Sequence, residues 1–264
     1  MSIVRKYFIS VWIAAALLTI AAASLSAQSN DDKALAIVAN AVKQLGGERY
    51  LNVTSQIGKG SFSQLRQGSV ASYQTFTDAI IFPDKERTDF KGSSRSTQVN
   101  VGDTGWIFDG DQEIIKIQVP TQIENFKRGL RTSLDDLLRG YWKGQATLSY
   151  VGKRQGTIGK RDDVIRLTYT DGFTVDFEFD DTGLPVKALY THKAVSDDTI
   201  KDEDRYAQFV DFDGIKAPLV VDHYLDGQPV SRINYDSYEF NKRIPDSVFT
   251  KPSSVKEARK DVKY

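Results

Sequence analysis

The hydrophobic residues of this chain follow a helical period in two stretches and a period of two almost everywhere else. The first helical stretch is DDKALAIVANAVKQLGG, residues 31–47, where apolar side chains recur at spacings of three and four: Leu35, Val38, Ala41, Val42 and Leu45. Asp31 and Asp32 suit a helix N-terminus, and Gly46 with Gly47 predicts its end. We therefore expect one amphipathic helix ahead of the first strand.

Between residues 50 and 119 the period changes to two, and the residue types change with it. Short segments rich in Thr, Val, Ile, Phe and Tyr alternate with Gly, Pro, Asp and Ser, as in VASYQTFTDAIIFP, STQVNVG and EIIKIQV. β-branched and aromatic residues fit the pleated surface of a sheet, and the intervening residues favour turns. The pattern predicts an antiparallel meander with tight turns.

The second helical stretch, IENFKRGLRTSLDDLLRGYW, interrupts the strands at residues 123–142. Its apolar residues again recur at spacings of three and four: Ile123, Phe126, Leu130, Leu134, Leu137, Leu138 and Tyr141. Thr132 or Ser133 can cap a second helix that has two aspartates in its first turn. We predict two helices, with a break near Gly129 and an end near Gly140.

Strands resume at residue 146. FTVDFEFDD, residues 173–181, alternates most regularly, so that Phe173, Val175, Phe177 and Phe179 share one face of a strand. Asp-Gly pairs at 213–214 and 226–227 lie between alternating residues and predict tight hairpins. Since neither a repeat nor a change of composition marks a boundary, we expect one mainly β (α+β) domain over residues 28–264. A long antiparallel sheet tends to curl, and the two helical stretches can cover its concave face.

The first residues of the chain have the order of a secretory signal peptide. Arg5 and Lys6 precede an uncharged, mostly apolar run over residues 7–23, and small residues follow up to an expected cleavage after Ala27. The alternative is an uncleaved N-terminal membrane anchor, because no charge occurs between Lys6 and Asp31. Both interpretations predict an exported protein, with the periplasm as the expected location.

Charge and cysteine content exclude several classes of function. The chain has 35 basic and 35 acidic residues, and loss of Arg5 and Lys6 with the signal leaves 33 against 35. A balance of −2 gives no electrostatic case for nucleic-acid binding, which requires a clustered basic surface. The absence of cysteine excludes disulfides, thiolate metal sites, a cysteine nucleophile and attachment of lipid to cysteine.

The sequence contains none of the common catalytic motifs. Of the two histidines, His192 has no nearby motif, and His223 adjoins Asp222, which points to the opposite face of a strand. Both histidines are interpreted as strand or surface residues. Asp109 and Asp111 lie in a Gly-containing turn and resemble only half of a calcium loop. We therefore expect no enzyme activity, no cofactor and no metal.

Three stretches carry a resemblance to a known family. GDTGWIFD, residues 102–109, resembles the Gly-x-Thr-x-Trp hairpin of the periplasmic lipoprotein carriers, the LolA/LolB-like superfamily, and it follows a strand of the expected type at 80–90. DFDGIKAPLVVDHYLDGQ, residues 211–228, and EFNKRIPDSVFTKP, residues 239–252, are similar to later parts of such proteins. The order of leader, helix, meander, hairpin, helical insertion and further strands also agrees.

This resemblance implies an unclosed β-barrel whose helix-covered concave face binds the acyl chains of lipoproteins. Carried over by position, Trp106 and Phe108 lie on the strand after the hairpin, and Leu130, Leu134 and Leu138 belong to the covering helices. The chain departs from the carriers in its length and its longer C-terminal strand region, and no counterpart of the carriers' cavity arginine can be assigned.

The sequence thus predicts an exported, non-enzymatic protein that shields a lipid or lipoprotein acyl chain during envelope transport, with transient membrane contact. The alternative is an envelope sensor or protein-interaction module of the same fold, with Tyr224, Tyr235 and Tyr238 on an exposed surface. An unrecognised hydrolase ranks below both. The large apolar residues can either pack in an ordinary core or line a ligand cavity, and the sequence pattern fits both. The predicted cavity residues are Phe82, Trp106, Phe108, Leu130, Leu134, Leu138 and Trp142.

Overall fold

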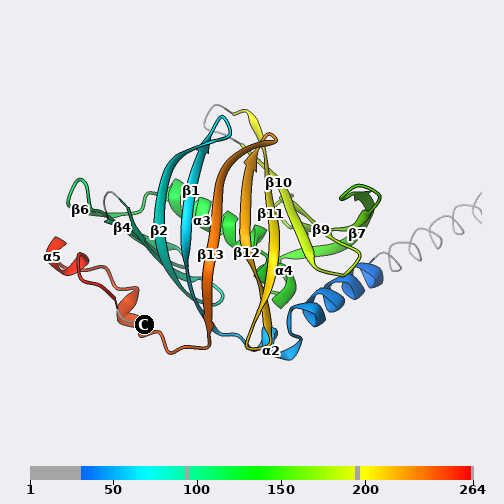
Figure 1. The fold of residues 1–264 in the computed structure, drawn as a ribbon, viewed down its shortest axis with the longest axis horizontal. Helices are drawn as coiled ribbons and strands as arrows, with labels where there is room; N and C mark the ends of the chain where they lie inside the picture. Colours follow the sequence, from blue (N-terminus) through cyan, green and yellow to red (C-terminus); the bar gives the residue numbers. More distant parts are fainter. Residues whose placement is uncertain (1–30, 93–94, 194–196, 263–264) are drawn as a thin grey trace, which may run out of the picture.

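The computed structural model describes residues 31–92, 95–193 and 197–262, which form one curved antiparallel sheet with a few helices (Figure 1). The sheet has thirteen strands in the order β6-β5-β4-β3-β2-β1-β13-β12-β11-β10-β9-β8-β7. The strands of the first half are β1 (Ser55–Arg66), β2 (Ser69–Ile81), β3 (Lys85–Lys91), β4 (Arg95–Val101), β5 (Thr104–Asp109) and β6 (Ile114–Ile117). Those of the second half are β7 (Ala146–Gln155), β8 (Arg161–Tyr169), β9 (Thr174–Phe179), β10 (Pro185–Lys193), β11 (Thr199–Phe212), β12 (Ile215–Leu225) and β13 (Gln228–Phe240).

The helices lie before, within and after this sheet. Residues 31–45 are helical and end at the predicted glycines. The remaining helical elements are α2 (Glu48–Leu51), α3 (Pro120–Thr132), α4 (Leu134–Arg139), the 3-10 turn η1 (Asp246–Val248) and α5 (Val255–Ala258). Within the described ranges, no helix combines the length and the apolar character needed to cross a bilayer.

The sheet curls without closing, which confirms the expected unclosed barrel. Its middle is the antiparallel pairing of β1 with β13, and its two edges are β6 and β7. Those edge strands do not pair, and α3 and α4 are the chain segment that connects them. Figure 1 shows α3 crossing behind the central strands, within the curve of the sheet, and α4 continuing from it toward β11. We call the face toward α3 and α4 the inner face.

The helical insertion breaks later than its glycine suggested. α3 continues through Gly129 to Thr132, so the expected break near Gly129 is wrong. The break lies at Ser133, whose extended backbone starts α4 and whose hydroxyl accepts a hydrogen bond from the Asp136 backbone N–H at 3.1 Å. A glycine on an exposed helix face lowers helix propensity but does not end a helix, whereas a capping side chain satisfies a free N–H.

The apolar residues form two separate cores on opposite faces of the sheet. The inner core joins the inner face of β7–β10 to α4 and the helix at 31–45, and it includes Val175, Phe177, Phe179, Leu137 and Ala41. The outer core lies on the outer face of β1–β5 beneath the C-terminal segment, residues 244–262, and it includes Ile57, Val99, Trp106, Phe108 and Phe249. The C-terminal segment therefore acts as a cover for the first half of the sheet.

A β-bulge sets the geometry of the central strands. The register of β1 with β13 shifts between Lys59 and Gly60, so that Gly58 pairs with Tyr238 and Gly60 with Tyr235. Because of the extra residue in β13, two tyrosines three positions apart face the same side. Both point to the inner face, where they border a cavity.

Candidate ligand-binding site

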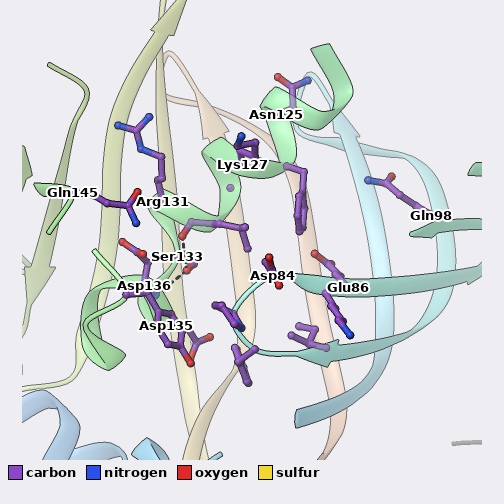
Figure 2. A pocket seen from close by; sticks show the side chains of 18 of the residues that line it. Asp84, Glu86, Gln98, Asn125, Lys127, Arg131, Ser133, Asp135, Asp136 and Gln145 are labelled. Atoms are coloured by element: carbon purple, nitrogen blue, oxygen red, sulfur yellow. Dashed lines mark hydrogen bonds between the residues drawn. The ribbon is translucent and has the colours of Figure 1, made fainter. Parts of the chain in front are cut away.

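Two adjoining cavities lie between the inner face and the helical insertion. The first has a volume of about 900 Å³ and the second about 340 Å³, which are typical of sites for small organic ligands. Figure 2 shows the first cavity, with Asn125, Lys127 and Arg131 on α3 and with Glu86 and Gln98 on the strands. The two cavities meet at shared wall residues, namely Ile80, Gly129, Ser133 and Asp135.

Both apolar and polar groups line the first cavity. The apolar groups come from the end of β2 and from α3: Ile80, Phe82, Phe126 and Leu130. Polar groups come from β3 and β4, where Glu86 and Gln98 project from the inner face, and also from α3 and α4. A ligand with one apolar and one polar end fits this mixed lining better than a wholly apolar ligand does.

The second cavity has a wall of aromatic rings from β10, β11 and β13. Tyr235 stacks on Tyr238 with ring centroids 4.5 Å apart, and Tyr238 is parallel to Phe240 at 5.8 Å. Tyr190, Tyr206 and Phe209 complete the aromatic lining. Such rings offer a large apolar area while their hydroxyl groups find polar partners, as Tyr238 does with the Pro218 carbonyl at 2.9 Å.

Ion pairs hold α3 across the opening of the barrel. Arg131 donates two hydrogen bonds to the Asp171 carboxylate in the β8–β9 turn, at 2.8 and 2.9 Å, and its guanidinium lies 3.9 Å from the Tyr169 ring centroid. This contact lowers the pKa of Asp171 to about 2. On the other side Lys127 donates to Asp103 in the β4–β5 turn at 2.5 Å. α3 is thus tied to turns of both sheet halves.

A buried arginine fixes α4 at the boundary of the second cavity. The Arg139 guanidinium donates to Asp135 at 2.7 Å and to the Tyr50 carbonyl at 2.7 Å, and it lies 4.4 Å from the Phe82 ring centroid. Tyr50 completes the group by donating its hydroxyl to Asp135 at 2.9 Å. These hydrogen bonds and ring contacts position α4 against the end of β2.

The second aspartate of α4, Asp136, is hydrogen-bonded to a tyrosine hydroxyl. Asp136 lines the first cavity and accepts a hydrogen bond from the Tyr169 hydroxyl at 2.5 Å. Burial raises the pKa of Asp136 to about 6, although Tyr169 and Arg131 act in the opposite direction. The same contact and burial raise the pKa of Tyr169, so its hydroxyl stays a donor.

Comparison with known proteins extends this description. No protein-family model matches the sequence, and comparison with curated proteins gives no match. Solved structures do match. A LolA superfamily protein from Nitrosomonas europaea is 15% identical with a TM-score of 0.56, over 83% of this chain and 97% of that one. A domain described as an outer membrane lipoprotein-sorting protein from Vibrio parahaemolyticus is 11% identical with a TM-score of 0.55, over 84% and 98%. The fold is LolA-like.

A third solved structure also matches this fold. The DUF1329 family protein from Desulfovibrio piger is 13% identical with a TM-score of 0.58, over 82% of this chain and 97% of that one. These identities are low, so the likeness concerns the backbone arrangement. The resemblance inferred from the hairpin at 102–109 is confirmed at the level of the fold.

Three of the seven predicted cavity residues line the cavities of this LolA-like fold, and two more lie in the inner core. Phe82 and Leu130 line the first cavity, and Leu134 lines the second. Leu138 and Trp142 are buried in the inner core, where the Trp142 indole donates to the Leu137 carbonyl at 3.0 Å. The roles of these residues in ligand binding stay predictions.

The other two, Trp106 and Phe108, are on the outer face, which corrects the expectation that they line the cavity. Gln98 lines the first cavity, so its neighbour Val99 points outward, and Trp106 is the cross-strand partner of Val99. The Trp106 indole donates to the Phe249 carbonyl of the C-terminal segment at 2.9 Å. Alternation shows which residues share a face of a strand, but it does not show which face is concave.

The aromatic wall is the part of the site that the sequence did not indicate. Tyr235 and Tyr238 were expected on an exposed surface, yet Tyr238 is only 8% exposed and both line the second cavity. A period of two places residues three apart on opposite faces, so only the bulge at β13 brings them together. Tyr224 lies elsewhere, beneath the Arg205 guanidinium at 3.9 Å.

The two histidines find carboxylate partners across strands rather than along them. His192 Nδ1 lies 2.5 Å from Asp202, and His223 Nδ1 lies 2.7 Å from Asp204, a residue that lines the second cavity. The hydrogen bond to Asp204 raises the pKa of His223. In the described part of the chain, no three acidic or histidine side chains are arranged to hold a metal ion.

Proposed function

We propose that this chain is an exported binding protein that shields a lipid or lipoprotein acyl chain from water during transport in the cell envelope, without catalysis. The observation that carries the proposal is the pair of adjoining cavities between the LolA-like sheet and α3–α4. Their walls are apolar at Phe82, Leu130 and Leu134, and aromatic along β10–β13.

Burial of an acyl chain supplies enough free energy for such a function. Each CH₂ group removed from water contributes about 0.8 kcal/mol, so a sixteen-carbon chain supplies on the order of 10 kcal/mol before ordering costs. No group has to be chemically activated for this. The similarity to the Vibrio parahaemolyticus structure, which is described as a lipoprotein-sorting domain, supports the same class of function.

The alternative function, a sensor or interaction module of the envelope, would be favoured by an interior filled with side chains. The two cavities favour ligand binding instead. The tyrosines that suggested a protein-binding surface, Tyr235 and Tyr238, line the second cavity, so they support a ligand site as well.

The direct test is to purify the protein from its native envelope, extract it with organic solvent and analyse the extract by mass spectrometry. We expect co-purified lipid. In vitro, N-phenylnaphthylamine fluorescence should rise on binding, and Leu130→Glu should abolish the rise because a charge then enters the first cavity. The matched control is Ile158→Glu, because Ile158 is fully exposed in the β7–β8 turn. Absence of lipid together with absence of probe binding would overturn the proposal.

A further inference from the structure

Two carboxylates on the inner face lie close to Ile80, a residue that both cavities share. Ile80 of β2 lines both cavities, and its cross-strand partner on β3 is Glu86, which lines the first cavity. Asp78 lies two residues before Ile80 and therefore projects from the same face of β2. Asp78 and Glu86 are thus diagonal neighbours on adjacent strands at the boundary of the site.

Asp78 is buried with part of its hydrogen-bonding capacity unused. The residue is 4% exposed, its Oδ2 accepts from the Tyr235 hydroxyl at 3.2 Å, and its Oδ1 has no hydrogen-bond partner. Burial, and then the charge of Glu86, raise the pKa of Asp78 to about 7. A buried carboxylate normally has a cation beside it; Asp78 has the Tyr235 hydroxyl and the backbone N–H groups of Gly58 and Asp78, all of which lower its pKa, but no cation among the described residues.

Gly58 provides the space in which Asp78 and Tyr235 meet. A Cβ atom at Gly58 would lie 2.2 Å from Asp78 Oδ1 and 2.7 Å from Tyr235 Cε1, and no side chain can occupy that position without moving both. The absence of a side chain on β1 therefore permits a carboxylate to lie directly beside the aromatic wall.

Glu86 makes one long hydrogen bond to the part of the chain that the structure describes. Its only hydrogen bond among the described residues comes from the Thr88 hydroxyl at 3.3 Å. Burial raises its pKa, the hydrogen bond from Thr88 acts in the opposite direction, and no cation of the described residues contributes. Glu86 and Asp78 thus place two acidic groups next to each other, with uncompensated negative charge whenever either is ionised.

The cations that border the first cavity are committed to other carboxylates. Lys85 turns away to Asp246 at 3.0 Å, on the side of the C-terminal segment. Lys127 and Arg131 bind Asp103 and Asp171, in the turns that hold α3. The protein thus supplies no cation of its own to this pair of acids within the described residues.

We propose that Glu86 and Asp78 bind the ammonium group of an amphiphile whose hydrocarbon part occupies the apolar walls of the two cavities. The inference rests on the proposed lipid-binding function and adds a headgroup preference to it. An ammonium group between Glu86 and Asp78 gains charge-assisted hydrogen bonds and faces the Tyr235 ring, which attracts cations. Phe76 adds a second ring, 5.3 Å from Tyr235 and edge-on to it.

The experiment compares amphiphiles that differ only in the headgroup, using the full mature protein after removal of bound lipid. Binding of dodecylamine and of dodecanoate is measured by calorimetry at pH 8, below their micellar concentrations. We expect dodecylamine to bind at least about tenfold more tightly than dodecanoate. Spermidine serves as a soluble cation without a hydrocarbon chain, and we expect it to bind at least about tenfold more weakly than dodecylamine.

Variants identify the acids responsible. Glu86→Gln and Asp78→Asn should each reduce the preference for dodecylamine over dodecanoate by about tenfold. Glu239→Gln, which removes a half-exposed carboxylate on the outer face of β13, should leave the preference unchanged. The readout is the ratio of two affinities in one protein sample, so partial loss of folded protein does not affect it.

The possible results separate this inference from the proposed function. Equal binding of dodecylamine and dodecanoate would overturn the headgroup preference while leaving lipid binding intact. If spermidine bound as tightly as dodecylamine, the proposal that the ligand is an amphiphile would be wrong, and the acids would form a site for soluble cations. Failure of every amphiphile and of N-phenylnaphthylamine to bind would overturn both proposals.

Discussion

The two halves of the sheet follow the same alternation of side chains but bury opposite faces. In β7–β10 the apolar residues face inward, and the outer face carries an ion-pair network in which Arg154 and Arg166 contact Asp176. In β1–β5 the main apolar cluster faces outward under the C-terminal segment, and acids such as Asp78 and Glu86 face inward. The half covered from outside is therefore free to present polar groups to the cavities.

This comparison assigns different tasks to residues that look equivalent in the sequence. Phe177 and Phe108 are both fully buried aromatic residues on regular strands. Phe177 packs in the inner core, whereas Phe108 packs in the outer core beneath the C-terminal segment. Mutations in the two halves should consequently separate stability from ligand binding.

The largest expected effect is that of Trp106→Ala. Removal of this indole leaves a cavity in the outer core and removes its hydrogen bond to the Phe249 carbonyl, so the free energy of unfolding should fall by about 3–5 kcal/mol. Urea denaturation measures the fall. The folded variant should bind N-phenylnaphthylamine with unchanged affinity. A variant with wild-type stability that no longer bound the probe would contradict the placement of Trp106 on the outer face.

A somewhat smaller effect, and one that depends on pH, is expected for Asp78→Asn. Asp78 keeps its proton up to about pH 7 when folded and loses it near its ordinary value of 3.8 when unfolded. The folded state therefore binds more protons between these values, and wild-type stability falls as the pH rises from about 4 to about 7. Glu86 from β3 and the Tyr235 hydroxyl from β13 face this carboxylate, and both are kept in the variant.

The variant lacks this titration, so its stability relative to wild type should rise by up to about 4 kcal/mol over that range. Urea denaturation at pH 4, 6 and 8 gives the difference directly. A difference that is independent of pH would show that Asp78 ionises normally in the folded protein, and it would contradict the buried inner-face placement.

The smallest effect is expected for Arg131→Gln, which releases α3 from the β8–β9 turn. Asp171 is 59% exposed, so the ion pair is screened by solvent, and the free energy of unfolding should change by less than about 1 kcal/mol. The pKa of Asp171, about 2 in the wild type, should rise toward 3.8, which carboxylate NMR titration can follow. Lys127→Gln is the matched control, because it breaks the other α3 contact and should leave Asp171 unchanged.

Helix ends, helix caps and tight turns of this molecule could be predicted because they depend on a few neighbouring residues. The glycines at 46–47 end the first helix, and the Asp213–Gly214 and Asp226–Gly227 turns have the positive φ values that tight hairpins require. Ser133 caps α4 as a residue of its type should. The division of the sheet into thirteen strands was less predictable, because short segments separated by weak turns are hard to divide.

The candidate site was less accessible from sequence because it depends on three-dimensional relations. Which face of β5 is concave depends on the curl of the whole sheet and on the C-terminal segment that covers Trp106. The aromatic wall depends on one bulged residue between Tyr235 and Tyr238. The meeting of Asp78 with Tyr235 depends on a missing side chain at Gly58, which reads in the sequence as a turn or strand glycine.

The pairing of β1 with β13 has a consequence for the order in which the molecule can fold. β1 meets its second neighbour, β13, only late in the chain: Gln56 pairs with Phe240, 184 residues further on. The outer core of β1–β5 is complete only when Phe249, which follows β13 in the chain, packs against it. Contacts so distant in sequence slow folding, so the earliest strands must remain incomplete until the last segment of the chain arrives.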